Sequence, residues 1–347
     1  MDTILQQLPA AILPWYRENK RPLPWRQDKE PYHIWLSEIM LQQTRVEAVK
    51  GYYTRFLEAL PTIHALASCD DDLLHKLWEG LGYYSRVRNL KKAAQTILLQ
   101  HNGLFPTTYE EVIALPGIGE YTAGAICSIA YDLPTPAVDG NVLRVITRLA
   151  EDPTPIDLPA YKTAVRQALS AIYPSDAGDF TQGLMELGAT VCGPNRKPDC
   201  ERCPCHAFCR SARSGTAEQF PVKLPKKPRK VQEMTVLILS CDGRYALQKR
   251  PNKGLLAGLW QFPNVPGHLD AQAALDAVEQ MGLKPRQLLR QVKRNHIFTH
   301  IQWDMVGTYL EVTAPEGDFT WLSGAQINAN AALPTAFRQF WEEENHV

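Results

Sequence analysis

The stretch from Leu115 to Arg144, LPGIGEYTAGAICSIAYDLPTPAVDGNVLR, constrains the fold of this chain most strongly. It places a tight turn that contains Gly117 and Gly119 between two segments with the apolar spacing of helices. Glycines let backbone N–H groups approach a phosphate closely, and the N-terminus of the helix that follows adds partial positive charge. The pattern therefore predicts two helices joined by a DNA-binding turn, with the carboxylate of Asp139 beside it.

Composition limits the setting of the chain. Its 347 residues are enough for two domains, and 45% apolar and 21% charged residues are ordinary for a globular protein. No segment approaches the ~18 uninterrupted apolar residues of a membrane helix, and the N-terminus lacks a signal-peptide pattern. We therefore expect a cytoplasmic protein. Since the formal net charge is +0, DNA affinity must come from local basic clusters and backbone dipoles.

The chain divides into a helical part and an α+β part. In residues 1–212, apolar spacings of three and four predict helices over 31–49, 88–101, 121–131, 141–150 and 161–173. Residues 213–231 contain prolines and basic residues but few core-forming positions, so we expect a linker. Residues 232–347 show two strands joined by an Asp242–Gly243 turn, a helix over 271–281, strands over 296–312 and a final helix near 335–341. The predicted fold class is therefore multidomain, all-α followed by α+β.

Two carboxylates are candidates for acid–base chemistry. Glu38 lies in the apolar helical segment WLSEIMLQQT, where desolvation raises a carboxyl pKa as a general acid requires. An exposed glutamate on an amphipathic helix is the alternative. Asp139 stands directly before Gly140 and Asn141 at a predicted helix start, where an aspartate is also a common N-cap. Its position after the glycine turn favours a catalytic role.

A cluster of cysteines indicates a metal site. Five of the eight cysteines fall between Cys192 and Cys209, which in a chain of this size does not resemble a disulfide framework. Cys200, Cys203 and Cys209 are separated by two and five residues, with Cys192 well before them. Four thiolates at such spacings bind either zinc or an iron–sulfur cluster, although zinc modules usually show two close pairs. Cys205 is left unassigned.

Several motifs together resemble those of one enzyme family. LPGIGEYTAGAI followed by VDGNVLRV is similar to the helix–hairpin–helix and Asp motif of base-excision DNA glycosylases, with the hairpin over about residues 107–131. LPWR (23–26), WLSEIMLQQT (35–44), GLGYYSRVRNL (80–90) and the late cysteines resemble the adenine DNA glycosylase, or MutY, family over nearly the whole chain. The resemblance implies a monomeric repair enzyme that hydrolyses the glycosidic bond of adenine mispaired with 8-oxoguanine or guanine in double-stranded DNA.

The resemblance implies roles for the residues at matching positions. Glu38 would protonate the purine as general acid, and Asp139 would stabilise or bond to the oxocarbenium-like sugar. Asn141 matches a position that orients groups near the sugar, and Tyr121 one that assists at the catalytic centre. Since the adenine must leave the base stack, base flipping is required.

The same resemblance assigns contacts to the substrate. For Trp25 and Tyr83, ordinary core packing is the alternative. For the basic strip Arg86, Arg88, Lys91 and Lys92, the alternatives are a solvated helix face and contact with phosphate. The implied contact residues are Trp25, Arg26 and Leu41 at the adenine pocket, Gln43, Leu81 and Tyr83 near the opposite base, the polar groups of Gln42 and Thr44 beside them, and Gly117 and Gly119 at the phosphate turn.

The residue two positions after Gly119 distinguishes base removal alone from base removal with strand cleavage. Relatives of the endonuclease III type carry a lysine there, whose amine attacks the sugar and cuts the strand. Tyr121 occupies this position and cannot form a Schiff base, and Leu143 stands where some MutY relatives carry a trappable lysine. We therefore expect a monofunctional glycosylase, with a pyrimidine-lesion glycosylase/lyase as the alternative.

The resemblance also covers the cysteine loop over residues 192–209. It implies one 4Fe–4S cluster held by Cys192, Cys200, Cys203 and Cys209, which would fix a basic loop against DNA. Seven residues separate the first two cysteines where the family usually has six, an extra residue that the loop GPNRKPD can absorb. The basic residues of the loop are Arg196, Lys197 and Arg202.

The C-terminal part, with GLLAGLWQFPNV (254–265), resembles a Nudix fold of the MutT type. Its helix over 271–281 lacks the glutamate-dense run that holds magnesium in the hydrolases, which argues against a DNA-binding Nudix hydrolase as the alternative function. The resemblance implies instead that this domain recognises 8-oxoguanine through a loop with Phe298, Thr299 and His300. Thr299 stands where the family commonly has serine. Packing between strands is the alternative for this loop.

Overall fold

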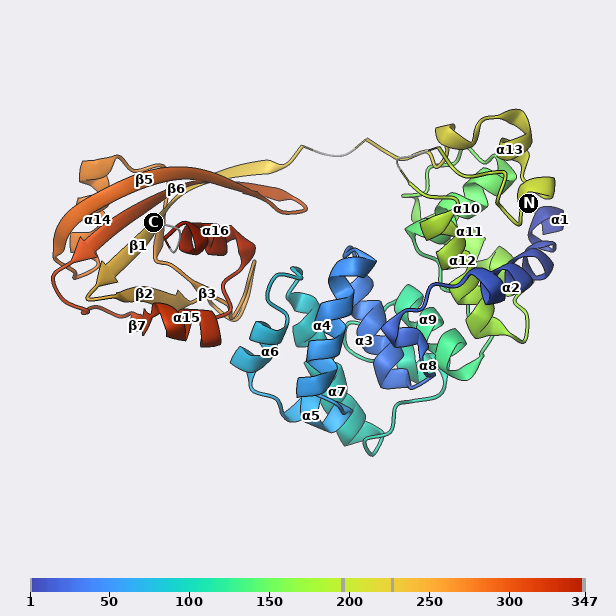
Figure 1. The fold of residues 1–347 in the computed structure, drawn as a ribbon, viewed down its shortest axis with the longest axis horizontal. Helices are drawn as coiled ribbons and strands as arrows, with labels where there is room; N and C mark the ends of the chain where they lie inside the picture. Colours follow the sequence, from blue (N-terminus) through green and yellow to red (C-terminus); the bar gives the residue numbers. More distant parts are fainter. Residues whose placement is uncertain (1, 195–196, 226–227, 345–347) are drawn as a thin grey trace. The chain divides into compact units, whose positions relative to one another are not determined.

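The computed structural model describes residues 2–194, 197–225 and 228–344. It divides into two compact units, residues 1–68 with 89–225 and residues 69–88 with 226–347 (Figure 1). Within the described residues, no helix combines the length and the apolar character needed to cross a membrane.

The first unit is built of helices, as the apolar spacing predicts. One helix, α7, begins in the second unit and continues into the first. The elements are α1 (Asp2–Leu5), α2 (Leu8–Asn19), η1 (Pro24–Arg26), α3 (Pro31–Leu41), α4 (Val46–Ala59), α5 (Ile63–Ser68), α7 (Ser85–Gln100), α8 (Tyr109–Ile113), α9 (Glu120–Tyr131), α10 (Gly140–Ala150), α11 (Pro159–Ser170), α12 (Ala177–Thr190), η2 (His206–Phe208), α13 (Arg210–Ser214) and η3 (Ala217–Gln219).

The helix predicted over residues 31–49 is interrupted. Helix α3 ends at Leu41 and α4 begins at Val46, with Gln43 in the left-handed backbone conformation (φ 59°) between them. A left-handed residue cannot continue a right-handed helix. Gln42, Gln43 and Thr44 therefore lie in a turn rather than on the next turn of the Glu38 helix, as a simple continuation of the apolar pattern would place them.

The predicted turn between two helices lies between α8 and α9. Gly117 has φ 78°, a conformation that favours glycine, and a Cβ there would lie 2.5 Å from the Cβ of Asn89. Gly119 has ordinary dihedrals and is the N-cap of α9, so the N-terminus of that helix follows the turn directly. Helix α9 packs against α3 and α12. The glycine turn is thereby connected to α3 and α12 through α9.

The second unit contains a seven-stranded mixed sheet. The strand order is β3-β2-β1-β6-β5, with β4 paired to β1 and β7 to β2, and only the β1–β6 pair is parallel among the described pairings. Its elements are α6 (Asp71–Leu77), β1 (Lys230–Cys241), β2 (Arg244–Lys249), β3 (Trp260–Gln261), β4 (Asn264–Pro266), α14 (Ala271–Gln280), β5 (Pro285–Ile297), β6 (Ile301–Val312), β7 (Thr320–Ser323), α15 (Gly324–Asn330) and α16 (Thr335–Glu344).

Helices cover both faces of this sheet (Figure 1). Successive side chains of a strand point to opposite faces, and β1 is apolar on both. Val236 and Ile238 pack in the core formed with α15 and α16, whereas Leu237 and Leu239 pack in the core formed with α14. The turn after β1 joins it to β2 with positive φ at Asp242 and Gly243, as the sequence predicts.

Three segments differ from the sequence-based expectation. Strand β5 begins at Pro285, well before residue 296, and its alternating exposed positions hide it from an apolar pattern. Helix α15 has a Ser323 capping box that was not predicted. The expected linker over 213–231 is partly structured: Arg148 Nε donates to the carbonyl of Phe220 at 3.0 Å, which ties this segment to α10.

A close backbone contact positions the segment that carries Asp139. A Cβ on Gly124 in α9 would lie 2.4 Å from the carbonyl oxygen of Pro136. We expect Gly124→Ala to lower the free energy of unfolding by about 1–3 kcal/mol because backbone atoms cannot yield as a flexible side chain can. Urea unfolding measures this change.

Gly51→Ala is the matched control for this prediction. Gly51 lies inside α4 with nothing near its missing Cβ, so alanine there should stabilise the protein by about 0.5–1 kcal/mol. Equal stability of the Gly124→Ala variant and the wild type would contradict the close contact.

Candidate active site

A cavity of about 170 Å³ in the first unit collects the predicted catalytic residues. Its wall comes from η1, α3, the turn after α3, α9, the start of α10 and α12. The predicted residues on this wall are Trp25, Arg26, Glu38, Leu41, Thr44, Tyr121, Asp139 and Asn141. The wall residues range from Arg21 to Ala189, so segments far apart in sequence are brought to one site.

Glu38 is buried, as its apolar neighbours predict. Helix α3 is buried from Ile34 to Met40, and Glu38 is 6% exposed. Tyr121 on α9 donates its hydroxyl to Glu38 Oε2 at 2.6 Å. Burial raises the pKa of Glu38 to about 7; the Tyr121 hydrogen bond opposes this rise, the Asp139 charge adds to it, and the Arg26 charge opposes it. This carboxyl can hold a proton at neutral pH.

Asp139 is both a helix cap and a cavity residue. Its Oδ1 accepts from the Val142 backbone N–H at 2.8 Å, which confirms the N-cap alternative, and its Oδ2 accepts from Asn141 Nδ2 at 2.6 Å. Burial raises the pKa of Asp139, whereas these hydrogen bonds and the Arg144 charge favour the ionised form. The carboxylate is thus held in one orientation at the cavity wall.

A buried arginine connects Asp139 to the cysteine loop. Arg144 Nη2 donates to Asn141 Oδ1 at 2.8 Å and to the carbonyl of Gly188 at 2.7 Å, and its Nε donates to the carbonyl of Cys192 at 2.9 Å. Sequence reasoning placed Arg144 only within a helix. The signal for its role was a charged residue inside a helix that is otherwise apolar over VLRVI.

A second buried carboxylate was also missed. Glu186 on α12 lines the cavity and pairs with Arg21 at 2.6 Å and with Arg26 at 2.8 Å. Arg26 is thereby fixed at the cavity wall. Glu186 is a single acidic residue in the apolar segment GLMELGA, as Glu38 is in its own apolar segment. This pattern in the sequence indicates a buried carboxylate.

The other predicted contact residues have different surroundings. Trp25 is 7% exposed and packs edge-on against Tyr53 at 5.6 Å, so it belongs to the core as well as to the cavity. Gln42 donates to Thr122 Oγ1 at 3.3 Å and lines, with Gly117 and Gly119, a surface cavity of about 390 Å³ that also contains Lys162 and Arg166. The glycine turn therefore has two cations beside it.

The basic strip is not a solvated face at its first two positions. Arg86 is 8% exposed, donates to the carbonyls of Leu81 and Gly82, and has its pKa lowered to about 10 by burial. Arg88 donates to the carbonyl of Ala257 at 2.8 Å. Both guanidinium groups bind backbone carbonyl groups of the second unit, which contradicts the solvated-face alternative at these two positions, and phosphate contact by the strip stays a prediction.

The four cysteines expected to bind a metal converge. Cys192, Cys200, Cys203 and Cys209 line one small cavity, and Arg148 Nη1 donates to Cys192 Sγ at 3.2 Å. The buried Cys205 is not on this wall. A common cavity with a cationic donor suits thiolate ligands. Arg196 lies outside the described residues.

The second unit contains a larger cavity of about 400 Å³. Phe298, Thr299 and His300 line it together with Tyr83, which is 46% exposed and not a core aromatic. Tyr83 and Thr299 share a hydrogen bond of 3.3 Å between their hydroxyl oxygens. Leu81, by contrast, is 6% exposed. Phe298 also packs on Trp303 at 4.8 Å, so strand packing accounts for part of this loop.

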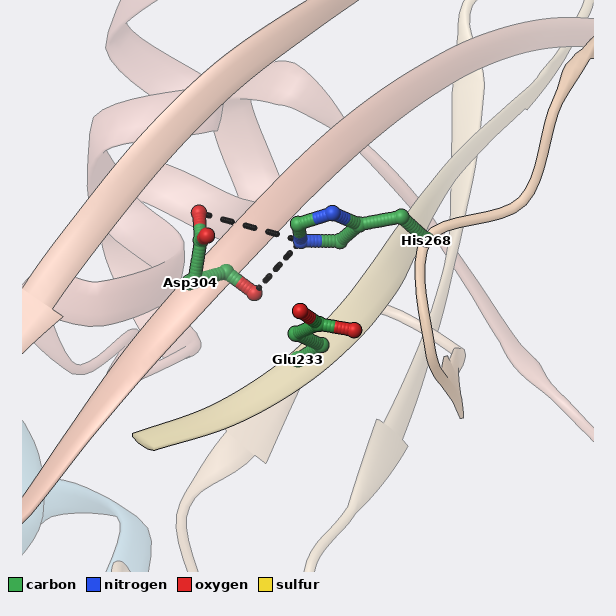
Figure 2. Close-up of side chains that lie close together, drawn as sticks. All are labelled: Glu233, His268 and Asp304. Atoms are coloured by element: carbon green, nitrogen blue, oxygen red, sulfur yellow. Dashed lines mark hydrogen bonds and ion pairs between the residues drawn. The ribbon is translucent and has the colours of Figure 1, made fainter. Parts of the chain in front are cut away.

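One acidic cluster bears on the alternative of a Nudix hydrolase. Glu233 and Asp304 are direct neighbours on β1 and β6, with His268 beside them (Figure 2). His268 Nε2 forms a hydrogen bond with the carbonyl oxygen of Asp304 at 3.1 Å. The cluster therefore has a structural explanation, because this bond attaches the loop that carries His268 to the sheet. It lies outside the α14 helix where the sequence comparison with hydrolases places a magnesium site.

Comparison with known proteins defines the class of the chain. Residues 36–168 match the model of the HhH-GPD superfamily of base excision DNA repair proteins, and residues 234–343 match a NUDIX domain model. The fold is similar to that of a thermostable thymine-DNA glycosylase (TM-score 0.55, 27% identity, 61% of this chain and 98% of that one). The expected fold class, a helix–hairpin–helix domain followed by a Nudix-like domain, is confirmed.

Proteins similar in sequence identify the family within this class of DNA repair proteins. The chain is 35% identical to the adenine DNA glycosylases of Rattus norvegicus and Homo sapiens, over 94% and 95% of its own length and 76% and 72% of theirs. It is 38% identical to that of a Buchnera aphidicola strain, over 73% of this chain and 72% of the relative. The chain belongs to the adenine DNA glycosylase family and is a DNA glycosylase of base-excision repair.

The raised pKa of Glu38 predicts how stability depends on pH. Between the unfolded value of 4.5 and the folded value of about 7, the folded protein binds the extra proton, so the contribution of Glu38 is favourable below pH 4.5 and is lost as pH rises through 7. The free energy of unfolding of Glu38→Gln minus that of the wild type should therefore be larger at pH 8 than at pH 4. The increase should be at most about 3 kcal/mol. Urea unfolding at both pH values measures the difference, and an equal difference at both would contradict the shift.

Proposed function

We propose that the enzyme removes adenine mispaired with 8-oxoguanine or guanine by hydrolysis of its glycosidic bond. The observation that supports this most directly is the pairing of two carboxyl groups with different environments at one cavity. Burial raises the pKa of Glu38 to about 7, against one hydrogen bond. Burial raises the pKa of Asp139 as well, but two hydrogen bonds and the Arg144 charge oppose that rise and favour the ionised form. Such a division between acid and anion suits the cleavage of a sugar–base bond.

The proposed reaction begins with extrusion of adenine from the duplex into the cavity. Glu38 donates its proton to the purine, which leaves as a neutral base, and the hydroxyl of Tyr121 stabilises the carboxylate that remains. Asp139 stabilises the positive charge that develops on the sugar, and Asn141 keeps its carboxylate in place. Water then adds to the anomeric carbon and gives its proton to the ionised Glu38, which completes the hydrolysis and restores the acid. Trp25, Arg26 and Leu41 form the wall against the base.

The same geometry argues against strand cleavage through a Schiff base. The residue at the position of the lyase lysine is Tyr121, and its hydroxyl is bonded to Glu38. Burial and the Glu38 charge raise the pKa of Tyr121 well above its usual value, so it remains a hydrogen-bond donor. A monofunctional glycosylase is the proposal, and the pyrimidine-lesion lyase remains the alternative.

Single-turnover glycosylase assays on duplexes with A:8-oxoguanine and A:G mispairs test the function. Glu38→Gln and Asp139→Asn should each lower the rate of adenine release by about 10²–10⁴-fold without loss of folding.

The same assays test the role of Phe298 in the second unit. Phe298→Ala should leave the rate of adenine release from A:G nearly unchanged and reduce the preference for A:8-oxoguanine, with substitution of the exposed Thr313 by alanine as control. Wild-type rates in Glu38→Gln would refute the acid role, and no release from either mispair by the wild type would refute the substrate assignment.

We further propose that Cys192, Cys200, Cys203 and Cys209 hold one 4Fe–4S cluster. The four thiols line one cavity, which fits a shared group. When bound, the cluster would fix the loop without taking part in base removal. Through Arg144 and Asn141, the position of this loop also bears on Asp139.

Iron analysis and the visible absorption spectrum test the ligand set. Cys200→Ser should lose iron and colour because a thiolate ligand is removed, whereas Cys205→Ala should keep both. A colourless zinc-containing wild type would contradict the iron–sulfur assignment. Loss of iron in Cys205→Ala with retention in Cys200→Ser would contradict the choice of ligands.

A further inference from the structure

Two buried acids share the active-site cavity, and the mechanism above uses only one. Among the residues that the structure describes, Glu38 and Glu186 are the only acidic side chains classed as buried, and both line the cavity. Glu186 is 1% exposed. A buried carboxylate is costly unless it is paired and hydrogen-bonded. The cost of burying Glu186 must therefore be offset by its partners.

The carboxylate of Glu186 is fully engaged by two arginines. Oε1 accepts from the backbone N–H of Arg21 at 3.2 Å and from its Nε at 2.6 Å. Oε2 accepts from Arg21 Nη2 at 3.0 Å and from Arg26 Nη2 at 2.8 Å. Burial alone would raise the pKa of Glu186, but the hydrogen bonds from Arg21 and Arg26 keep it below its usual range. Glu186 is therefore an anion between two cations.

Arg26 lines the same cavity as Glu38, and of the two arginines it is the one whose charge acts on the pKa of Glu38. Its side chain is 12% exposed, its Nη1 donates to the carbonyl of Arg21 at 3.2 Å, and its guanidinium lies 5.5 Å from the ring centre of Tyr16. Within the described part of the chain, Arg26 has its ion pair with Glu186 and none with Glu38. Its charge is the smallest of the influences on Glu38.

Removal of Glu186 would change the charge beside Glu38. The cluster would go from one net positive charge to two, and the guanidinium of Arg26 would lose its carboxylate partner. A cation near a buried carboxyl stabilises the ionised form. Glu38 would then give up its proton at lower pH, and less of the enzyme would hold the acid form near neutrality.

We propose that Glu186 is a positioning residue that neutralises and orients Arg26, so that Glu38 keeps the proton that it transfers to the purine. This inference rests on the proposed acid role of Glu38. The remaining titratable groups are Tyr121 from α9 and Asp139 before α10, which face Glu38, and Tyr16 from α2 and Glu47 from α4, which act on the arginine cluster. None of them replaces the direct contact of Glu186 with Arg26.

The test is the pH dependence of single-turnover adenine release by the full-length enzyme on an A:8-oxoguanine duplex. In the wild type the rate should fall as pH rises through the pKa of Glu38. Glu186→Gln should move this fall to lower pH by about one unit or more, which is about a tenfold loss of rate above the wild-type midpoint. The double variant Glu186→Gln/Arg26→Gln should move the midpoint back, whatever its absolute rate.

Two further variants make the test independent of simple damage to folding. Asp179→Asn removes another carboxylate of α12 that pairs with an arginine, Arg17, at 3.0 Å on the surface, and should leave the midpoint unchanged. In Arg21→Gln, Arg26 alone pairs with Glu186, and the cluster loses its net positive charge. The pH midpoint should therefore move upward, in the direction opposite to that of Glu186→Gln. A purely structural role would not produce opposite shifts.

The outcomes separate this inference from the function on which it rests. If Glu38→Gln lacks the falling limb and Glu186→Gln keeps the wild-type midpoint, the positioning role is refuted while the acid role stands. If Glu38→Gln retains both rate and falling limb, the acid role itself is refuted. Should Glu186→Gln fail to fold, an unchanged or lowered midpoint in Arg21→Gln overturns the proposal.

Discussion

The desolvation of Glu38 is the constraint on which the active site depends. A carboxyl with an ordinary pKa would be ionised at neutral pH and have no proton to give. The nearly complete burial of α3 and the convergence of α9, α10 and α12 on the same cavity remove water from this group. The hydroxyl of Tyr121 supplies one hydrogen bond that either protonation state can use. The helical packing of the first unit is thus the source of its chemistry.

The second carboxylate is controlled by hydrogen bonds rather than by burial alone. Asp139 caps α10 and is held by Asn141, which Arg144 holds in turn, and Arg144 also binds the carbonyl of Cys192. The start of α10 therefore serves the fold and, in the proposed mechanism, the reaction as well. A buried and satisfied polar network of this kind is rigid, because a lost member leaves its partners unpaired. The cysteine loop and the carboxylate of Asp139 belong to one network.

Local patterns in the sequence were sufficient for much of this picture. The glycine turn, the burial of Glu38 and the Asp242–Gly243 hairpin follow from residue types within a few positions of each other. The break after Leu41 was not predicted because it depends on one left-handed residue, Gln43, without a glycine to signal it. The Glu186 pairs join residues about 160 positions apart, and only tertiary packing shows that a helical glutamate faces two arginines. Strand β5 was missed for a different reason, because its alternating exposed positions leave no apolar pattern.

The protonation state of Glu38 in the folded protein is the most direct measure of this account. Carboxyl ¹³C NMR of the glutamate-labelled protein, with Glu38→Gln to assign the resonance, follows its titration without reference to catalysis. The account predicts a midpoint of about 7. A midpoint near the ordinary value of 4.5 would contradict it.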